Sequence, residues 1–164
     1  MVRDARDGSV SPNVDAETRL QDDDHVSVRL LLRMLACTRQ IENQVRQFLQ
    51  SRFETTLSRF DLMAQLERVP EGLRMSELSQ RMMVTGGNVT GITNALETEG
   101  LVVRETDAVD GRVFRVKLTA EGRRQFTRMA REHERFVIEL FSPLNRKDKK
   151  QLLELLAELK RISA

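Results

Sequence analysis

The sequence of 164 residues has no tryptophan, no tyrosine and a single cysteine, and these absences exclude several classes of protein. One cysteine, Cys37, cannot form an intramolecular disulfide, so the chain is not a disulfide-stabilised secreted domain. No apolar run approaches the roughly 20 residues that a membrane-spanning helix needs. The segment 1–10 lacks the apolar stretch of a secretory signal. We therefore expect a cytoplasmic protein with no membrane contact.

Residues that build metal centres and catalytic sites are also scarce. His25, His133 and Cys37 do not make a convincing four-ligand metal site. We find no Ser-His-Asp set and no paired carboxylates, and Gly86-Gly87 lacks the preceding strand that a dinucleotide-binding loop requires. The sequence predicts no metal, no cofactor and no enzymatic activity.

Charge gives little indication of function. The net charge is +2, and the excess of basic residues lies in 119–164. Between 58 and 118 acidic residues slightly outnumber basic ones, so the basic stripe typical of nucleic-acid-binding proteins is missing there. The function of that segment must therefore be inferred from the residue pattern.

The two ends of the chain predict long helices. Residues 1–24 show no hydrophobic periodicity, and we assign them to a mobile tail. Residues 25–57 carry an apolar stripe at helical spacing, which includes Cys37. Residues 119–164 predict two further amphipathic helices, capped by Thr119 and Asn145. Helices of such length favour a subunit interface, so we expect 25–57 and 119–164 to mediate dimerisation.

The segment 58–118 predicts three short helices and a β-hairpin. Ser58 and Asp61 have the spacing of a capping box, Ser76 is expected to cap the next helix, and Gly100 ends a helix over 87–99. The largely apolar run 101–104 then predicts a strand, and apolar residues alternate with basic ones over 113–118, which predicts a second. The expected fold class is mainly α with a small β-hairpin: a winged helix-turn-helix domain flanked by long dimerisation helices.

This arrangement predicts DNA binding, because the second helix of such a motif enters the major groove by its N-terminal end. The residues expected there, small and polar, are Thr85, Gly86, Gly87, Asn88, Thr90 and Gly91, with Thr93 and Asn94 one turn later. Glycines allow the backbone to approach phosphate, and the amides of Asn88 and Asn94 can read base edges. At the hairpin tip, Arg112 suits the minor groove, and Asp110 can orient its guanidinium.

Several motifs together resemble the MarR family: Ser76-Glu77-Leu78-Ser79, the run Val89–Glu97, Gly100-Leu101-Val102, Asp110-Gly111-Arg112 and the run Val116–Gly122. The resemblance implies a homodimeric, ligand-responsive transcription factor, usually a repressor, that dimerises through its first and last two helices. It also implies that 87–99 is the recognition helix and Arg112 the wing arginine, with Asp110 as its partner. The stretch 83–91 resembles a branch that regulates aromatic-acid catabolism and includes regulators that respond to hydroxycinnamoyl-CoA thioesters.

The expected effector is an aromatic acid or its CoA thioester, which would release the protein from a pseudo-palindromic double-stranded DNA operator. Family members often supply tyrosine or tryptophan to the effector pocket, and this chain has neither. The candidate effector-binding residues are Arg29, Arg33, Phe60, Met63 and His133. His133 lies on an apolar face, where a core histidine is the alternative reading.

Two other functions stay open at this stage. Cys37 is a candidate redox sensor, although a free cysteine on an apolar stripe also behaves as a small hydrophobic residue. Alternatively, the winged domain binds a protein rather than DNA.

Overall fold

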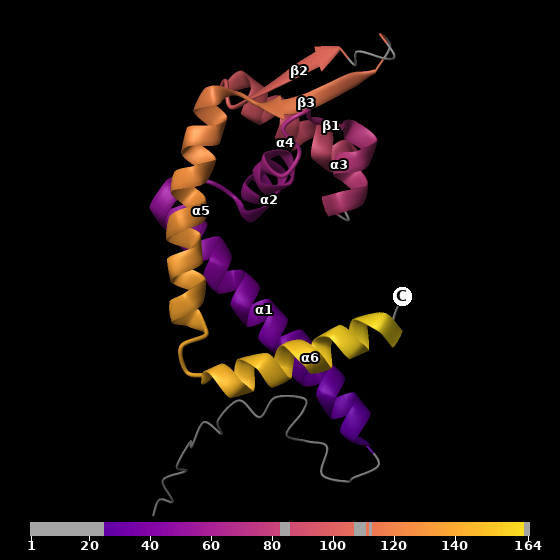
Figure 1. The fold of residues 1–164 in the computed structure, drawn as a ribbon, viewed down its shortest axis with the longest axis vertical. Coiled ribbons are helices and arrows are strands. Elements are labelled where there is room, and N and C mark those ends of the chain that lie inside the picture. Colours follow the sequence, from indigo (N-terminus) through magenta and orange to yellow (C-terminus); the bar gives the residue numbers. More distant parts are fainter. Residues whose placement is uncertain (1–24, 83–85, 107–110, 112, 163–164) are drawn as a thin grey trace, which may run out of the picture. The chain divides into compact units, whose positions relative to one another are not determined.

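The computed structural model describes residues 25–82, 86–106, 111 and 113–162, so the expected tail 1–24 lies outside it. In these ranges it confirms the expected fold class, mainly helical with a small antiparallel sheet (Figure 1). The elements in chain order are α1 (Val26–Phe53), α2 (Leu57–Glu67), β1 (Leu73–Arg74), α3 (Met75–Met82), α4 (Gly86–Thr98), β2 (Val102–Thr106), β3 (Phe114–Leu118), α5 (Ala120–Leu140) and α6 (Arg146–Ile162).

The chain divides into two compact units, Met1–Arg46 and Gln47–Ala164. In the first unit the structure describes one continuous stretch of α1, as the apolar periodicity predicts. Large apolar side chains on this stretch are exposed, namely Val26, Val28, Leu30, Leu31 and Leu35. Cys37 is also exposed. This helix therefore carries apolar surface that the described part of its own unit does not cover.

The second unit has one hydrophobic core, formed between α2, α3, α4, the sheet and the first half of α5. Leu62, Leu78, Val89, Leu96 and Val116 are fully buried in it. Helix α5 adds Phe126 and Met129 to this core. No helix in the described ranges is long and apolar enough to cross a membrane.

The sheet has the strand order β1-β3-β2, with both pairs antiparallel. The hairpin strands β2 and β3 were expected, whereas β1 was not. Two residues, Leu73 and Arg74, are too few to show the alternation by which a strand is recognised in sequence. Gly72 enters this strand at a φ of 88°, and a β-carbon there would lie 2.7 Å from the carbonyl oxygen of Val116. The turn before β1 therefore requires glycine.

The caps expected for α2 and α3, Ser58 and Ser76, are wrong. Thr56, not Ser58, caps α2: its backbone is extended, and its hydroxyl accepts a hydrogen bond from the amide of Arg59 at 3.3 Å. Ser76 lies inside α3, where the Glu77 carboxylate accepts from the Arg74 amide at 2.7 Å. In both cases another suitable acceptor lies nearby in the sequence, so residue type alone does not decide the start.

The other expected termini are confirmed. Thr119 caps α5 by accepting from the Gly122 amide at 3.0 Å, and Asn145 accepts from the Asp148 amide at 3.0 Å before α6. Gly100 follows α4 with a φ of 71° and donates its amide to the Glu97 carbonyl at 2.9 Å. A left-handed glycine in this position ends a helix without steric cost.

Candidate nucleic-acid interface

Helix α4 has one buried face and one open face. Val89, Thr93 and Leu96 are fully buried at helical spacing. The exposed residues toward its start are those expected to meet DNA: Gly86, Gly87, Asn88, Thr90, Gly91 and Asn94. Thr93 was expected on the open face, and this is wrong. It lies four residues after Val89 and three before Leu96, so the helical period carries it into the core, where its hydroxyl donates to the Val89 carbonyl at 2.8 Å.

The start of α4 is sterically open. Among the described residues, no heavy atom outside the adjoining helix backbone lies within 4 Å of the position that a β-carbon would occupy at Gly86, Gly87 or Gly91. The hydroxyl of Thr90 donates to the Gly86 carbonyl at 2.9 Å. The first amides of a helix have no partner within the helix and carry its positive dipole end, so this surface can receive an anion such as a phosphate. Thr85 lies outside the described residues.

The second half of α4 is fixed by two arginines from other elements. Arg59 of α2 forms an ion pair with Glu99, and Arg104 of β2 forms one with Glu97. The guanidinium of Arg104 also donates to the side-chain oxygen of Asn94 at 2.6 Å. Glu97, the one acidic residue of α4, and Glu99 just after its end are thereby compensated, which reduces the electrostatic repulsion between this region and a phosphate backbone.

Sequence reasoning did not identify Arg59 and Arg104. The glutamate partner of Arg59 is 40 residues away in the chain, a separation that helical periodicity does not connect. A signal for Arg104 was present: it lies two residues after the buried Val102, so strand alternation places both side chains on the sheet face that packs against α4.

Comparison with known proteins agrees with this geometry. The MarR family profile matches residues 54–113. A MarR family transcriptional regulator from Silicibacter pomeroyi is 30% identical, with a TM-score of 0.74 over 88% of this chain and all of that one. The chain belongs to the MarR family.

An uncharacterised HTH-type transcriptional regulator of Bacillus cereus is 29% identical over 84% of this chain and 90% of its own length. The MepR–DNA complex of S. aureus has the same fold, at 19% identity and a TM-score of 0.69 over 87% of this chain and all of that one.

In this MarR-family transcriptional regulator, the hairpin formed by β2 and β3 follows α4 in the chain. Its outermost described pair is Thr106 opposite Phe114, and Phe114 is exposed. Across the strands, Lys117 forms an ion pair with Glu105 at 2.7 Å. The expected wing residues Asp110 and Arg112 lie outside the described residues.

The candidate effector residues fall into separate groups. The ring centroid of Phe60 is 4.8 Å from that of His133 and 5.4 Å from that of Phe126. His133 is half-buried, and its burial lowers the pKa of the imidazole. Met63 is fully buried in the core. Arg29 and Arg33 belong to the first unit, where they line a hollow of about 230 Å³ with Val26 and Leu30. The structure thus joins Phe60 to His133, whereas Arg29 and Arg33 belong to the other compact unit.

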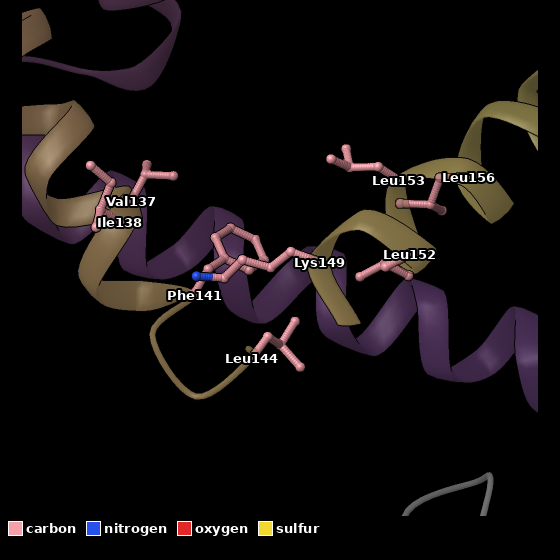
Figure 2. A pocket seen from close by; sticks show the side chains of 8 residues that line it. All are labelled: Val137, Ile138, Phe141, Leu144, Lys149, Leu152, Leu153 and Leu156. Carbon is pink, nitrogen blue, oxygen red and sulfur yellow. The ribbon is translucent and has the colours of Figure 1, made fainter. Parts of the chain in front are cut away.

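Helices α5 and α6 present a large apolar surface. Side chains from both helices and from the turn between them line a hollow of about 340 Å³, as Figure 2 shows. Its lining consists of Val137, Ile138, Phe141, Leu144, Lys149, Leu152, Leu153 and Leu156. Along α6 the exposed leucines are Leu152, Leu153, Leu155, Leu156 and Leu159.

Proposed function

We propose that this MarR-family regulator is a homodimeric repressor that binds a pseudo-palindromic DNA operator and is released by a small aromatic effector. The observation that carries the proposal is the open face of α4: small polar residues, glycines with open space around them in the described part of the chain, and the acidic side chains at its C-terminal end, Glu97 and Glu99, paired with arginines. A helix with these properties suits insertion into the major groove.

The proposed base and phosphate contacts are made by Thr85 and by the exposed residues of α4, namely Gly86, Gly87, Asn88, Thr90, Gly91 and Asn94. The glycines bring the backbone amides close to phosphate, while Asn88 and Asn94 offer amide groups to base edges. Arg112, oriented by Asp110, enters the adjacent minor groove. In this assignment 58–118 is the DNA-binding domain.

Dimerisation uses the long terminal helices, in the segments 25–57 and 119–164. The exposed leucines of α6 support this, because soluble monomers rarely leave a contiguous apolar patch of this kind in water. Two copies related by a two-fold axis would place two α4 helices in successive major grooves, about 10 base pairs apart.

The effector proposed for this dimer is an aromatic acid or its CoA thioester. Phe60 and His133 form a half-buried aromatic surface on which a planar ring can stack. Arg29 or Arg33 would pair with the carboxylate or phosphate of the effector, and Met63 backs Phe60 from within the core. Effector binding would favour a spacing of the two α4 helices that no longer fits the groove.

Selection of binding sites from a pool of random DNA duplexes tests the proposed DNA binding. We expect enrichment of one sequence with two-fold symmetry, bound with an affinity that falls steeply as salt rises, because phosphate contacts release counterions. A pool without enrichment at low salt would refute DNA recognition and favour a protein-binding winged domain. A thermal-shift screen of aromatic acids and their CoA thioesters tests the effector class, since a ligand of the native state raises the melting temperature.

A further inference from the structure

Arg104 reaches from β2 to α4 and contacts two side chains of that helix at once. One terminal nitrogen of its guanidinium pairs with the Glu97 carboxylate, and the other donates to the side-chain oxygen of Asn94 at 2.6 Å. The Arg104 side chain is three-quarters buried, with 25% of its surface exposed. Glu97 therefore holds the guanidinium in one orientation while it engages Asn94.

The chemistry of arginine decides how the Asn94 amide is turned. A guanidinium has only hydrogen-bond donors, so it must face the oxygen of the amide and not its NH2 group. The NH2 group of Asn94 then points away from Arg104, and Asn94 is exposed on the open face of α4.

This orientation limits what Asn94 can recognise. An asparagine that reads adenine uses both ends of its amide, the oxygen accepting from N6 and the NH2 donating to N7. In this structure the hydrogen bond from Arg104 occupies one of the two lone pairs of the oxygen and fixes the direction of the amide, so the NH2 group faces away from Arg104.

We propose that Arg104 is a positioning residue that makes Asn94 a hydrogen-bond donor toward DNA, directed at an acceptor instead of the paired edge of adenine. The proposal rests on the proposed function, because it needs α4 to bind a duplex. The acceptor is either a base atom, such as guanine O6 or N7 or thymine O4, or a phosphate oxygen.

The decisive variant is Asn94→Asp, measured with the duplex that the wild-type protein selects from a random pool. Aspartate keeps an oxygen for Arg104 and removes the NH2 donor, so the melting temperature should be unchanged or higher. Affinity for the selected duplex should fall roughly 5- to 100-fold. Thr98→Asp adds the same charge one turn further along α4 and measures the effect of charge alone; its loss of affinity should be clearly smaller.

Single base-pair substitutions in the duplex separate the two acceptors. If Asn94 donates to a base, the affinity difference between wild type and Asn94→Ala should disappear when one base pair of each half-site is changed. If it donates to phosphate, that difference should persist for every duplex. Either pattern supports the donor role.

Arg104 itself is tested by repeating the selection with Arg104→Leu and Arg104→Lys. Leucine frees the amide to turn, so preference at the Asn94-dependent position should broaden or shift. Lysine retains a donor for the Asn94 oxygen and should restore the wild-type preference. A purely structural role for Arg104 would lower the melting temperature of both variants without altering base preference.

The inference is overturned if Asn94→Asp binds the selected duplex as tightly and selectively as the wild-type protein. The proposed function fails separately, at the first step, if the wild-type protein enriches no duplex.

Discussion

The α-carbon of Gly122, in the first turn of α5, lies directly against the carbonyl group of Leu101, the residue immediately before β2. A β-carbon built at Gly122 would be 1.9 Å from the Leu101 oxygen. The same oxygen accepts a hydrogen bond from the Thr119 amide at 3.0 Å. The close approach therefore joins the long helix α5 to the winged domain through backbone atoms, and only glycine permits it.

Gly122→Ala should consequently destabilise the fold, although alanine is the better helix former. We expect a loss of about 1–3 kcal/mol in the free energy of unfolding, because the clash is with backbone and cannot be relieved by a side-chain rotation. Urea unfolding followed by circular dichroism measures it.

Gly91→Ala is the matched control for that substitution. Gly91 is also helical, but no heavy atom lies near the added methyl group. It should therefore raise stability by about 0.5–1 kcal/mol. If Gly122→Ala raised stability as Gly91→Ala is expected to, the close contact between α5 and Leu101 would be refuted.

Thr90→Ala should weaken binding to the selected duplex roughly fivefold, the loss expected of one hydrogen bond worth about 1 kcal/mol. Thr98→Ala provides the control on the same helix. Both hydroxyls are exposed and donate to the carbonyl four residues earlier, at 2.9 Å in each case, so the structural cost of removing them is the same. Thr98 lies at the far end of α4, and its loss should leave affinity unchanged. Equal effects in a fluorescence-anisotropy titration would remove the N-terminal half of α4 from the interface.

His133 should make stability depend on pH. Burial holds its pKa below the ordinary value of 6.5, so the unfolded chain takes up the proton at a higher pH than the folded chain. The contribution of neutral His133 is then complete above the ordinary pKa and is lost as the pH falls toward the folded pKa.

His133→Phe keeps an aromatic ring against Phe60 and removes this titration. Urea unfolding at pH 7.5 and pH 5.5 should show that wild type loses more stability on acidification than the variant. Identical losses would show that the imidazole is as well hydrated in the folded chain as in the unfolded one.

Leu153→Glu should convert the dimer to a monomer, because it places a charge in the apolar surface shared by α5 and α6. Leu153 is 68% exposed in the single chain, so the substitution should not disturb the fold of the subunit. We expect the dissociation constant of the dimer to rise at least roughly tenfold, since an unpaired buried charge is costly. Sedimentation velocity, with circular dichroism to confirm helix content, gives the answer.

Gln151→Glu introduces the same charge on the same helix, at an exposed position that is already polar. It should leave the association state unchanged. A Leu153→Glu protein that sediments as the wild type does would place the subunit interface elsewhere.

The features that the sequence predicts well are those that repeat along the chain. Periodicity identifies α1, α5 and α6, and residue type identifies the caps Thr119 and Asn145 and the terminating glycine at 100. Periodicity depends only on residues that are close together in the chain, so it can be recognised without knowing the tertiary contacts.

The features that sequence reasoning missed depend on packing. Strand β1 exists because Leu73 and Arg74 pair with β3, more than 40 residues later in the chain. Thr93 has a polar side chain and is nevertheless buried. Its hydroxyl tolerates burial because it donates a hydrogen bond to the Val89 carbonyl of the same helix. The ion pairs of Arg59 and Arg104 arise only when α2, α4 and β2 come together. The candidate DNA-contact residues at the start of α4 were named from their chemistry, and their contact with DNA stays a prediction.

We expect two copies of this chain to read DNA together, each through its α4 helix. Hydroxyl-radical footprinting of the selected duplex tests this expectation most directly, because the positions of backbone protection report both symmetry and spacing. Two equivalent protected half-sites should appear, about 10 base pairs apart from centre to centre, and both should be lost with Leu153→Glu but not with Gln151→Glu. A single asymmetric footprint, or one that survives Leu153→Glu unchanged, would contradict it.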